Sequence, residues 1–321
     1  MSAAAALLRR HPLLGAIFIT ILLHVCGTVL IEGYSSPFSI RAMLVLAALL
    51  AIASTGQTLV IILGGIDLSI PFVIGFANVV AAQLTGQGMP FWLVAGIVAV
   101  LALAIGAING ALSAALRIHP LIVTLGVGTV VQGLVLIWTK GFPSGSAPGF
   151  VSAFVSIGGS LGPLPVPGLI PALIVMAVVL VVLLGRTSYG RKLYAQGGNP
   201  TAAPFALINP LAMWVITFAL SAFFAAVAGV LLLGFTGSAY GDVGQPYLFQ
   251  TIAAVVIGGT SLIGGRGSYP GTLAGAVALT EINTLLIGLG LQPSLVQAAL
   301  GAIIILLVSL YGREPHLRTT I

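Results

Sequence analysis

The stretch LVIILGGIDLSIPFVIG (residues 59–75) joins two apolar runs through a pair of glycines and a single aspartate, Asp67. Only 5% of the 321 residues are charged, whereas 59% are hydrophobic. A water-soluble domain carries about 25% charged residues, so this chain has too few to cover a surface that faces water. The composition therefore indicates a chain that lies in a lipid bilayer.

The apolar runs predict helices that cross the membrane. Many runs are about 20 residues long, which is the length a helix needs to span the hydrocarbon core. They are continuous, whereas the strands of a membrane barrel alternate between apolar and polar residues. Since lipid offers no partners to backbone polar groups, continuous apolar segments must be helical. We expect an all-α, polytopic transmembrane bundle of about ten spans that forms a single domain over residues 1–321. The expected spans lie near residues 13–31, 40–63, 71–86, 91–116, 121–139, 167–185, 211–234, 247–263, 270–290 and 293–311.

The positions of lysine and arginine predict the orientation, because short cytoplasmic loops are enriched in these residues. With the N-terminus inside, only Arg41 and Lys140 fall outside. The other basic residues fall on the inner side: Arg9, Arg10, Arg117, Arg186, Arg191, Lys192, Arg266, Arg313 and Arg318. Both termini are therefore expected in the cytoplasm, with tails at residues 1–12 and 312–321. This scattered pattern explains the net charge of +6 without nucleic-acid binding.

Two loops are longer than the rest. The outer loop, residues 140–165, contains Phe150, Phe154 and Ile157 at helical spacing, which predicts a short surface helix. The inner loop, residues 186–209, contains GGNPTAAP. There Asn199 followed by Pro200 is typical of a helix start, and we expect a short helix that Pro204 stops within about a turn. Asn209 followed by Pro210 repeats the signal at the start of the next span.

Asp67 admits two interpretations. Gly64-Gly65 can end one helix in the left-handed conformation, and Asp67 and Ser69 can accept hydrogen bonds from the first N–H groups of the next helix. In that interpretation Asp67 caps a tight turn and stays near water. In the other, Asp67 belongs to a gate or an ion path.

A second glycine-rich stretch, VVIGGTSLIGGRGSYPG (residues 255–271), is similar to the first, since AVVIGGTSLIG aligns with VIILGGIDLSI. It lacks the spacing of a phosphate-binding loop and lies between membrane helices, which favours close helix packing. Small residues four apart predict further close contacts at Gly271 and Gly275, at Gly106 and Gly110, and along Ser221, Ala225 and Gly229. The residues expected at helix junctions or gates are Gly64, Gly65, Asp67, Ser69, Gly258, Gly259, Gly264 and Gly265.

Polar residues inside the spans need a partner or water, so they are candidates for lining a path. These candidates are Gln57, Asn78, Asn109, Gln132, Gln250, Glu281 and Asn283. Glu281 is the acidic residue that lies deep in a predicted span, and it either hydrogen-bonds a neighbouring helix or lines the path. The four histidines lack the spacing of metal ligands, and neither a catalytic constellation nor a Walker motif occurs. We therefore expect no metal, cofactor or catalytic residue in this chain, and any ATP with its Mg²⁺ must be handled by a partner.

Four segments, taken in order, carry a resemblance to a known family. They are LVIILGGIDLSI, ALRIHPLIVTLG, SYGRKLYAQGGNPTAA and AVVIGGTSLIGGRGSYPGTLAGA. The chain resembles, over residues 40–310, the permease subunits of bacterial ABC importers for ribose and related monosaccharides. Four features depart from the family pattern. Thr201 stands where an acidic residue is common and Pro204 where a basic residue is common. ALI at residues 206–208 replaces the usual SGI, and Glu281 is unusual for the matching helix.

The resemblance implies an inner-membrane permease that pairs with a second copy or a sister permease. It also implies a cytoplasmic ATPase with two fused nucleotide-binding domains and a periplasmic sugar-binding protein. The outer loop and the segment around Tyr240, Asp242 and Gln245 would meet the binding protein. The ATPase-coupling residues that it implies are Tyr189, Gly190, Arg191, Asn199, Pro200, Thr201, Ala202 and Ala203. The alternatives are a stand-alone secondary transporter or channel and, less favoured, a polytopic membrane enzyme.

Overall fold

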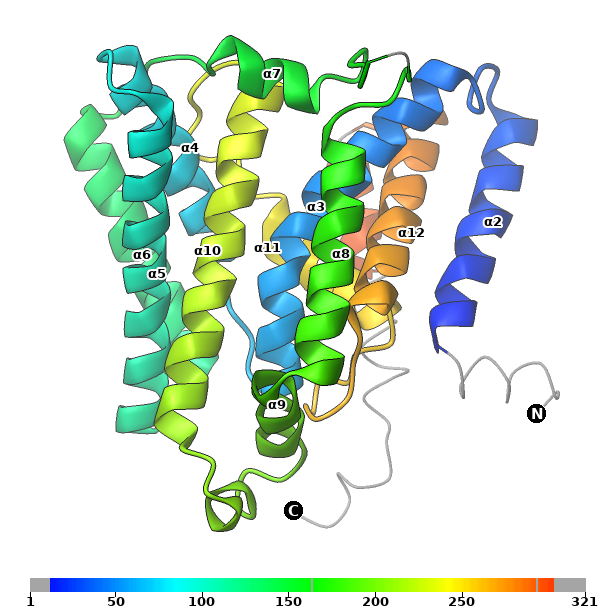
Figure 1. Cartoon of the computed structure of the whole chain (residues 1–321). Coiled ribbons are helices and arrows are strands. Elements are labelled where there is room, and N and C mark those ends of the chain that lie inside the picture. The colour runs from blue at the N-terminus through cyan, green and yellow to red at the C-terminus, as the bar shows by residue number, and fades with distance from the viewer. Residues whose placement is uncertain (1–11, 163, 293, 303–321) are drawn as a thin grey trace, which may run out of the picture.

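The computed structural model describes residues 12–162, 164–292 and 294–302, and the described chain is a bundle of helices (Figure 1). The named elements are α2 (Pro12–Leu30), α3 (Pro37–Leu63), α4 (Ile70–Gly86), α5 (Phe91–Leu116), α6 (Pro120–Thr139), α7 (Gly149–Val155), α8 (Leu169–Arg186), α9 (Ser188–Gly198), the 3₁₀ helix η1 (Ala203–Ala206), α10 (Pro210–Thr236), α11 (Tyr247–Ile257) and α12 (Tyr269–Gly288).

Seven of the described helices are long and apolar enough to cross a bilayer, namely α2, α3, α5, α6, α8, α10 and α12. The apolar helices α4 and α11 are shorter, with 17 and 11 residues. The predicted span 247–263 is therefore wrong at its end, because α11 stops at Ile257 and Gly259 then adopts a positive φ of 83°. Of the predicted span 293–311, residues 294–302 are helical and the remainder lies outside the described residues.

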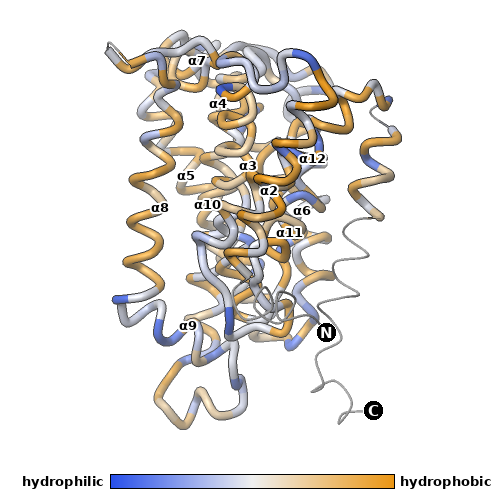
Figure 2. The backbone as a smooth tube through the Cα atoms, turned by 90° about the vertical axis from the view of Figure 1, so that its right-hand side faces the viewer, coloured by the Kyte–Doolittle hydropathy of each residue, from blue (hydrophilic) through white to orange (hydrophobic). Residues whose placement is uncertain are grey.

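The two ends of the bundle differ (Figure 1). At one end, which we call the α9 face, α9 and η1 extend beyond the long helices. At the opposite end, the α7 face, α7 lies across the top of the bundle. Figure 2 shows α8 as hydrophobic along its length, whereas hydrophilic residues gather in the loops around α9. This distribution fits a bundle whose flanks face lipid and whose ends face water.

Small residues set the packing of α10, which contacts α3, α4 and α5. A Cβ atom on Gly106 or Gly110 of α5 would collide with the backbone of α10. A Cβ atom on Gly56 of α3 would likewise collide with Ser221 of α10, and one on Gly229 of α10 would collide with the Ile74 carbonyl of α4. Without a hydrophobic driving force in lipid, such close backbone approach is what holds helices together. The predicted small-residue contacts of α5 and α10 are thus confirmed.

Local signals begin and end the helices as expected. Gly64 ends α3 with a φ of 95°, and its N–H donates to the carbonyl of Ile61. The Oδ1 of Asn209 accepts from the N–H of Ala212 at 3.2 Å and caps α10. The short helix predicted in the outer loop is α7. α3 forms the interior of the bundle and is buried continuously over residues 47–63.

Candidate functional site

The turn between α3 and α4 carries Asp67, and its carboxylate is buried with 2% of the residue exposed. Oδ1 accepts hydrogen bonds from the N–H and the Oγ–H of Ser69 at 2.8 and 2.6 Å, and Oδ2 accepts from the Oγ–H of Ser221 on α10 at 2.7 Å. Asp67 thus binds the N–H of Ser69, the residue that precedes α4, but the predicted cap by the Ser69 side chain is wrong, because that side chain accepts no hydrogen bond from an N–H group of α4. The expectation that Asp67 stays near water is wrong, because three protein donors take the place of water.

Two more helices hold the same turn. Asn109 of α5 donates from Nδ2 to the Oγ of Ser69 at 2.9 Å. Thr124 of α6 accepts from the N–H of Leu68 at 3.0 Å. The polar side chains Asp67, Ser69, Asn109 and Ser221, which we call the Asp67 cluster, therefore fix the turn to α5 and α10, while Thr124 ties it to α6. A turn fixed to three helices moves only when they move.

The second glycine-rich stretch forms the turn between α11 and α12. Gly259, Gly264 and Gly265 all have positive φ values, which a side chain rarely adopts. Gly271 and Gly275 of α12 pack against the backbone of α11, as predicted. The glycines therefore serve both close packing and a compact loop.

Four glycines bring the two turns and α9 together. The N–H of Gly265 donates to the carbonyl of Ile62 at the end of α3, at 2.8 Å. A Cβ on Gly197, in the last turn of α9, would collide with the same carbonyl. A Cβ on Gly264 would stand about 3 Å from Gly64 and from the carbonyl of Gly197. We call Gly64, Gly197, Gly264 and Gly265 the glycine junction, where any displacement of α9 reaches both turns through backbone contact.

Two tyrosines of α9 add side-chain contacts to the junction. The hydroxyl of Tyr194 donates to the carbonyl of Gly267 at 2.8 Å, and that of Tyr189 is hydrogen-bonded to Thr217 of α10 at 3.1 Å. Burial raises the pKa of Tyr189 to about 12 and also raises that of Tyr194. Both phenols therefore remain protonated at physiological pH, and these contacts do not depend on pH.

The helix predicted to start at Asn199 is wrong. α9 instead occupies Ser188–Gly198, residues 200–202 form a turn, and η1 follows. The Oδ1 of Asn199 accepts hydrogen bonds from the hydroxyl of Thr201 and from the N–H of Ala202. These bonds close a turn and do not start an α-helix. Pro200 also takes part in this turn. Gly190 allows the sharp corner between α8 and α9, since a Cβ there would collide with the Leu184 carbonyl.

The tip of the inner loop presents two apolar side chains. Phe205 is 91% exposed and Leu207 is 93% exposed. Leu207 also has a positive φ of 58°, which costs backbone energy for a non-glycine residue. These two exposed side chains make the tip of the inner loop a candidate contact surface.

The predicted path-lining residues fall into different environments. Asn78 and Asn109 are buried, and Asn78 binds backbone groups of Gly229 and Tyr240. Gln57 is buried, and neither atom of its amide has a hydrogen-bond partner. Gln132 binds Asp242 and is partly exposed. Gln250 and Asn283 are also partly exposed.

Glu281 connects α12 to α2 and to the loop that follows α2. Its Oε1 lies 3.0 Å from the Nδ1 of His24, and its Oε2 accepts from the hydroxyl of Tyr34 at 2.7 Å. Burial, with a contribution from Glu281, raises the pKa of Tyr34, which therefore stays protonated and donates. These contacts support the expectation that Glu281 bonds a neighbouring helix.

Replacement of Glu281 tests this role. Glu281→Ala leaves the buried hydroxyl of Tyr34 and the part-buried His24 without a partner, so we expect the free energy of unfolding to fall by about 1–3 kcal/mol. Glu281→Gln retains an acceptor for Tyr34 and should lose less, with solute uptake retained. Denaturation of the purified protein in detergent and uptake into proteoliposomes measure both effects. Loss of uptake in a fully stable Glu281→Gln protein would contradict the structural role and favour ion coupling.

The segment 237–246, between α10 and α11, is the part that sequence reasoning missed. Tyr240, Asp242 and Gln245 were expected at an outer surface. All three side chains are exposed, whereas the backbone N–H of Tyr240 donates to the Oδ1 of Asn78 at 2.9 Å, so the segment packs against α4. The signal that could have found it is the pair of glycines just before Pro246, which predicts an unwound segment.

Within the described ranges there is no cluster of three or more histidine, cysteine, aspartate or glutamate residues that could hold a metal ion. The site consists of the glycine junction, the buried hydrogen bonds of the Asp67 cluster and the exposed inner loop. Such an arrangement is suited to transmitting movement.

Comparison with known proteins identifies related transport proteins. A sequence profile described as "Branched-chain amino acid transport system / permease component" matches residues 39–308. The ribose import permease protein of Escherichia coli strain K12 is 35% identical over 266 residues, which cover 83% of each chain. The ribose import permease protein of Bacillus subtilis is 33% identical and covers 94% of this chain and 92% of its own. The fructose import permease protein of Rhizobium meliloti is 31% identical over 88% of this chain and 80% of its own.

No solved structure matches this chain significantly. The family match extends over most of the residues, and the similar proteins have nearly the same length, so the match includes both turns, α9 and the inner loop. The chain therefore belongs to this family of transport permeases, as a multi-pass permease subunit of a bacterial ABC importer.

Proposed function

We propose that this permease imports a monosaccharide or a related small polar solute, through alternating access driven by a separate ATPase. The observation that carries the proposal is the glycine junction, because it joins an exposed cytoplasmic loop to two turns inside the membrane bundle. The similarity to import permeases for ribose and fructose supports the solute class. ATP and Mg²⁺ would be bound by the partner alone.

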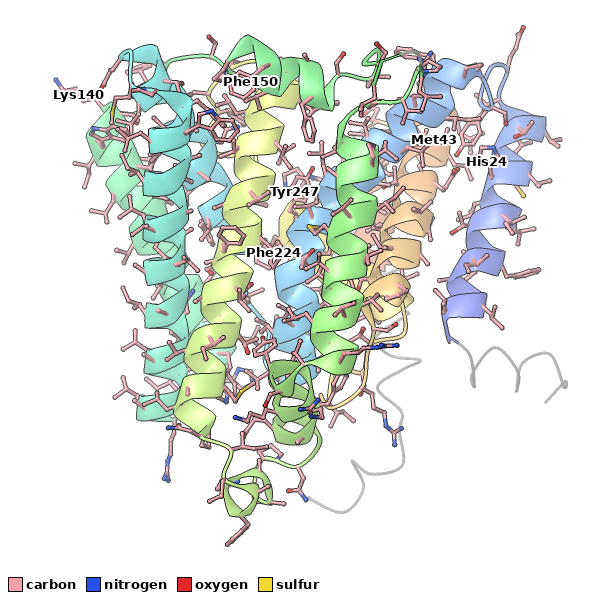
Figure 3. All side chains as sticks on the ribbon, viewed as in Figure 1. His24, Met43, Lys140, Phe150, Phe224 and Tyr247 are labelled. Carbon is pink, nitrogen blue, oxygen red and sulfur yellow. The ribbon has the colours of Figure 1, made fainter. Side chains whose placement is uncertain are left out.

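The α9 face would be cytoplasmic. Of the seven lysines and arginines within the described residues, Arg41 and Lys140 lie toward the α7 face, where Figure 3 shows Lys140. The other five, at positions 117, 186, 191, 192 and 266, lie in segments of the α9 face. The excess of basic residues supports a cytoplasmic α9 face, and with about ten spans both termini would lie inside.

The inner loop would bind the ATPase. Phe205 and Leu207 would enter an apolar pocket of that partner, with Arg191 and Lys192 of α9 beside it. Closure of the ATPase around ATP would then push α9, and Gly197 would pass the movement to α3 and to the α11–α12 turn. On the other side, residues 140–165 would meet a periplasmic sugar-binding protein, and a second permease copy or a sister permease would complete the path.

Reconstitution tests this function. The chain, purified with its co-isolated ATPase and binding protein and placed in liposomes, should hydrolyse ATP in response to sugar and take up the sugar. Substitution of both Phe205 and Leu207 by aspartate should weaken ATPase binding by roughly a hundredfold or more, because it removes two apolar anchors from a buried contact. Affinity measured between purified subunits gives this value.

Phe142 provides a matched control for that experiment. It is 84% exposed, but it lies beside Lys140 near the α7 face. Phe142→Asp should leave ATPase affinity unchanged. Equal effects of the two substitutions, or sugar uptake that needs no nucleotide, would refute the proposal.

A further inference from the structure

The segment 237–246, which we call the re-entrant segment, enters the bundle from the α7 face and runs beside α4. A Cβ on Gly75 would collide with the carbonyl of Gly241, and one on Gly244 would collide with the carbonyl of Pro71. The residues of the segment follow α4 downward, from Asn78 to Pro71, as their own numbers rise. The segment is therefore antiparallel to α4 and lies along it.

The re-entrant segment reaches the middle of the membrane. Gly244 contacts Pro71, and the distance along α4 from Pro71 to its end at Gly86 is about 22 Å at 1.5 Å per residue. Figure 3 shows Tyr247, the first residue of α11, inside the bundle, below Lys140 and above Phe224. Non-helical backbone at this depth is tolerated only where protein buries it or where it lines a water-filled cavity.

The side chains of the segment show whether its backbone is buried by protein or lines a water-filled cavity. Asp242 and Gln245 are both exposed. Oδ1 of Asp242 accepts from Nε2 of Gln132 on α6 at 2.9 Å, which leaves Oδ2 and the Oε1 of Gln132 able to accept further hydrogen bonds. Gln132 lies seven residues below the outer end of α6, about 10 Å along the helix, where an exposed carboxylate with two amides would be very costly against lipid. They therefore face water.

From this geometry we infer that Asp242, Gln132 and Gln245 form a solute-binding subsite halfway along a water-filled path. This inference rests on the proposed import function and names the site where the solute pauses. The carboxylate and the amides together offer several acceptors and donors, which suits the adjacent hydroxyl groups of a neutral sugar. Phe72 of α4 packs on Gly128 of α6 and supplies an apolar wall.

The subsite lies above the turn between α3 and α4. Gly128 precedes Gln132 by four residues, and Thr124, which holds the N–H of Leu68, precedes Gly128 by four more. Each step is about 6 Å along α6, so the subsite is about 12 Å above the α3–α4 turn. The turn that carries the Asp67 cluster therefore forms the floor of the subsite, and the glycine junction controls that floor.

Cysteine accessibility tests whether the subsite faces water. The sequence has one cysteine, so Cys26→Ser gives a cysteine-free background. In it, Asp242→Cys and Gln245→Cys should react with a charged, membrane-impermeant thiosulfonate. The matched controls are Val130→Cys and Leu134→Cys, since both positions are 61% exposed on α6 at a similar height. Because a thiol in apolar surroundings forms little thiolate, positions 242 and 245 should react about tenfold faster or more.

Transport by the reconstituted complex tests whether the subsite binds sugar. With saturating loaded binding protein and D-ribose, D-fructose or D-galactose as probe, Asp242→Asn should lower uptake about tenfold, as expected for one lost hydrogen bond to a charged group. ATP hydrolysis without sugar and ATPase affinity should be unchanged. Gln87→Ala, at the exposed end of α4, is a control outside the subsite and should transport normally.

The outcomes separate this inference from the proposed function. Equal labelling at the four cysteine positions, or normal uptake by Asp242→Asn, overturns the subsite. So does an Asp242→Asn protein whose only change is its response to Na⁺ or to a proton gradient, since that would identify a cation site. Failure of the unaltered chain to bind an ATPase would instead overturn the proposed function, while the labelling pattern would still decide whether the path exists.

Discussion

Replacement of Gly197 by alanine should abolish the coupling of ATP hydrolysis to sugar uptake. The added Cβ would collide with the Ile62 carbonyl at the end of α3, in the contact that joins α9 to the two turns. Forcing extra volume into such a packed contact costs about 1–3 kcal/mol. The equilibrium ratio of intact to separated junctions should fall roughly tenfold to a hundredfold. Uptake per ATP hydrolysed by the reconstituted complex measures the effect.

The neighbouring glycine gives a closely matched control. Gly198 lies in the same helical turn, yet a Cβ there would stand 3.9 Å from Gly265, which is ordinary van der Waals contact. Gly198→Ala should therefore couple normally. If Gly197→Ala and Gly198→Ala behaved alike, the glycine junction would have no role in transmitting movement. Retained ATPase affinity in both proteins would show that the effect arises after docking.

Removal of the Asp67 carboxylate should cause the largest loss of stability. Asp67→Ala would leave the N–H and hydroxyl of Ser69 and the hydroxyl of Ser221 without their acceptor, in a site that water does not reach. Each buried donor left without its acceptor typically costs about 1–3 kcal/mol, so we expect a total loss of about 3 kcal/mol or more. Denaturation of the purified protein in detergent should show this decrease in the free energy of unfolding.

Two further variants define the cause. Asp67→Asn keeps an oxygen acceptor for Ser69, so we expect it to lose less than half as much stability. Asp242→Ala removes an exposed carboxylate with one amide partner and should cost about 1 kcal/mol or less. If the Asp67→Ala protein were as stable as the Asp242→Ala protein, the buried hydrogen bonds of Asp67 would not stabilise the turn.

Much of the fold could be predicted because its signals are local. The length of an apolar run, the cap at Asn209 and the left-handed break at Gly64 each depend on a few adjacent residues. The spacing of Gly106 and Gly110 likewise predicted a close helix contact without identifying α10 as the partner. The end of α11 and the bounds of α9 were missed, since the boundary of a short helix is decided by the contacts around it.

The sequence by itself determined that this chain is a helical membrane protein, where most of its spans lie, and which glycines and prolines interrupt them. Those properties follow from transfer of apolar segments into lipid and from the backbone freedom of single residues. The tertiary structure alone decided that Asp67 is buried by hydroxyls from α10, that Gly197 contacts α3, and that the re-entrant segment brings Asp242 to Gln132. These contacts join residues more than a hundred positions apart, and only the packed bundle makes them neighbours.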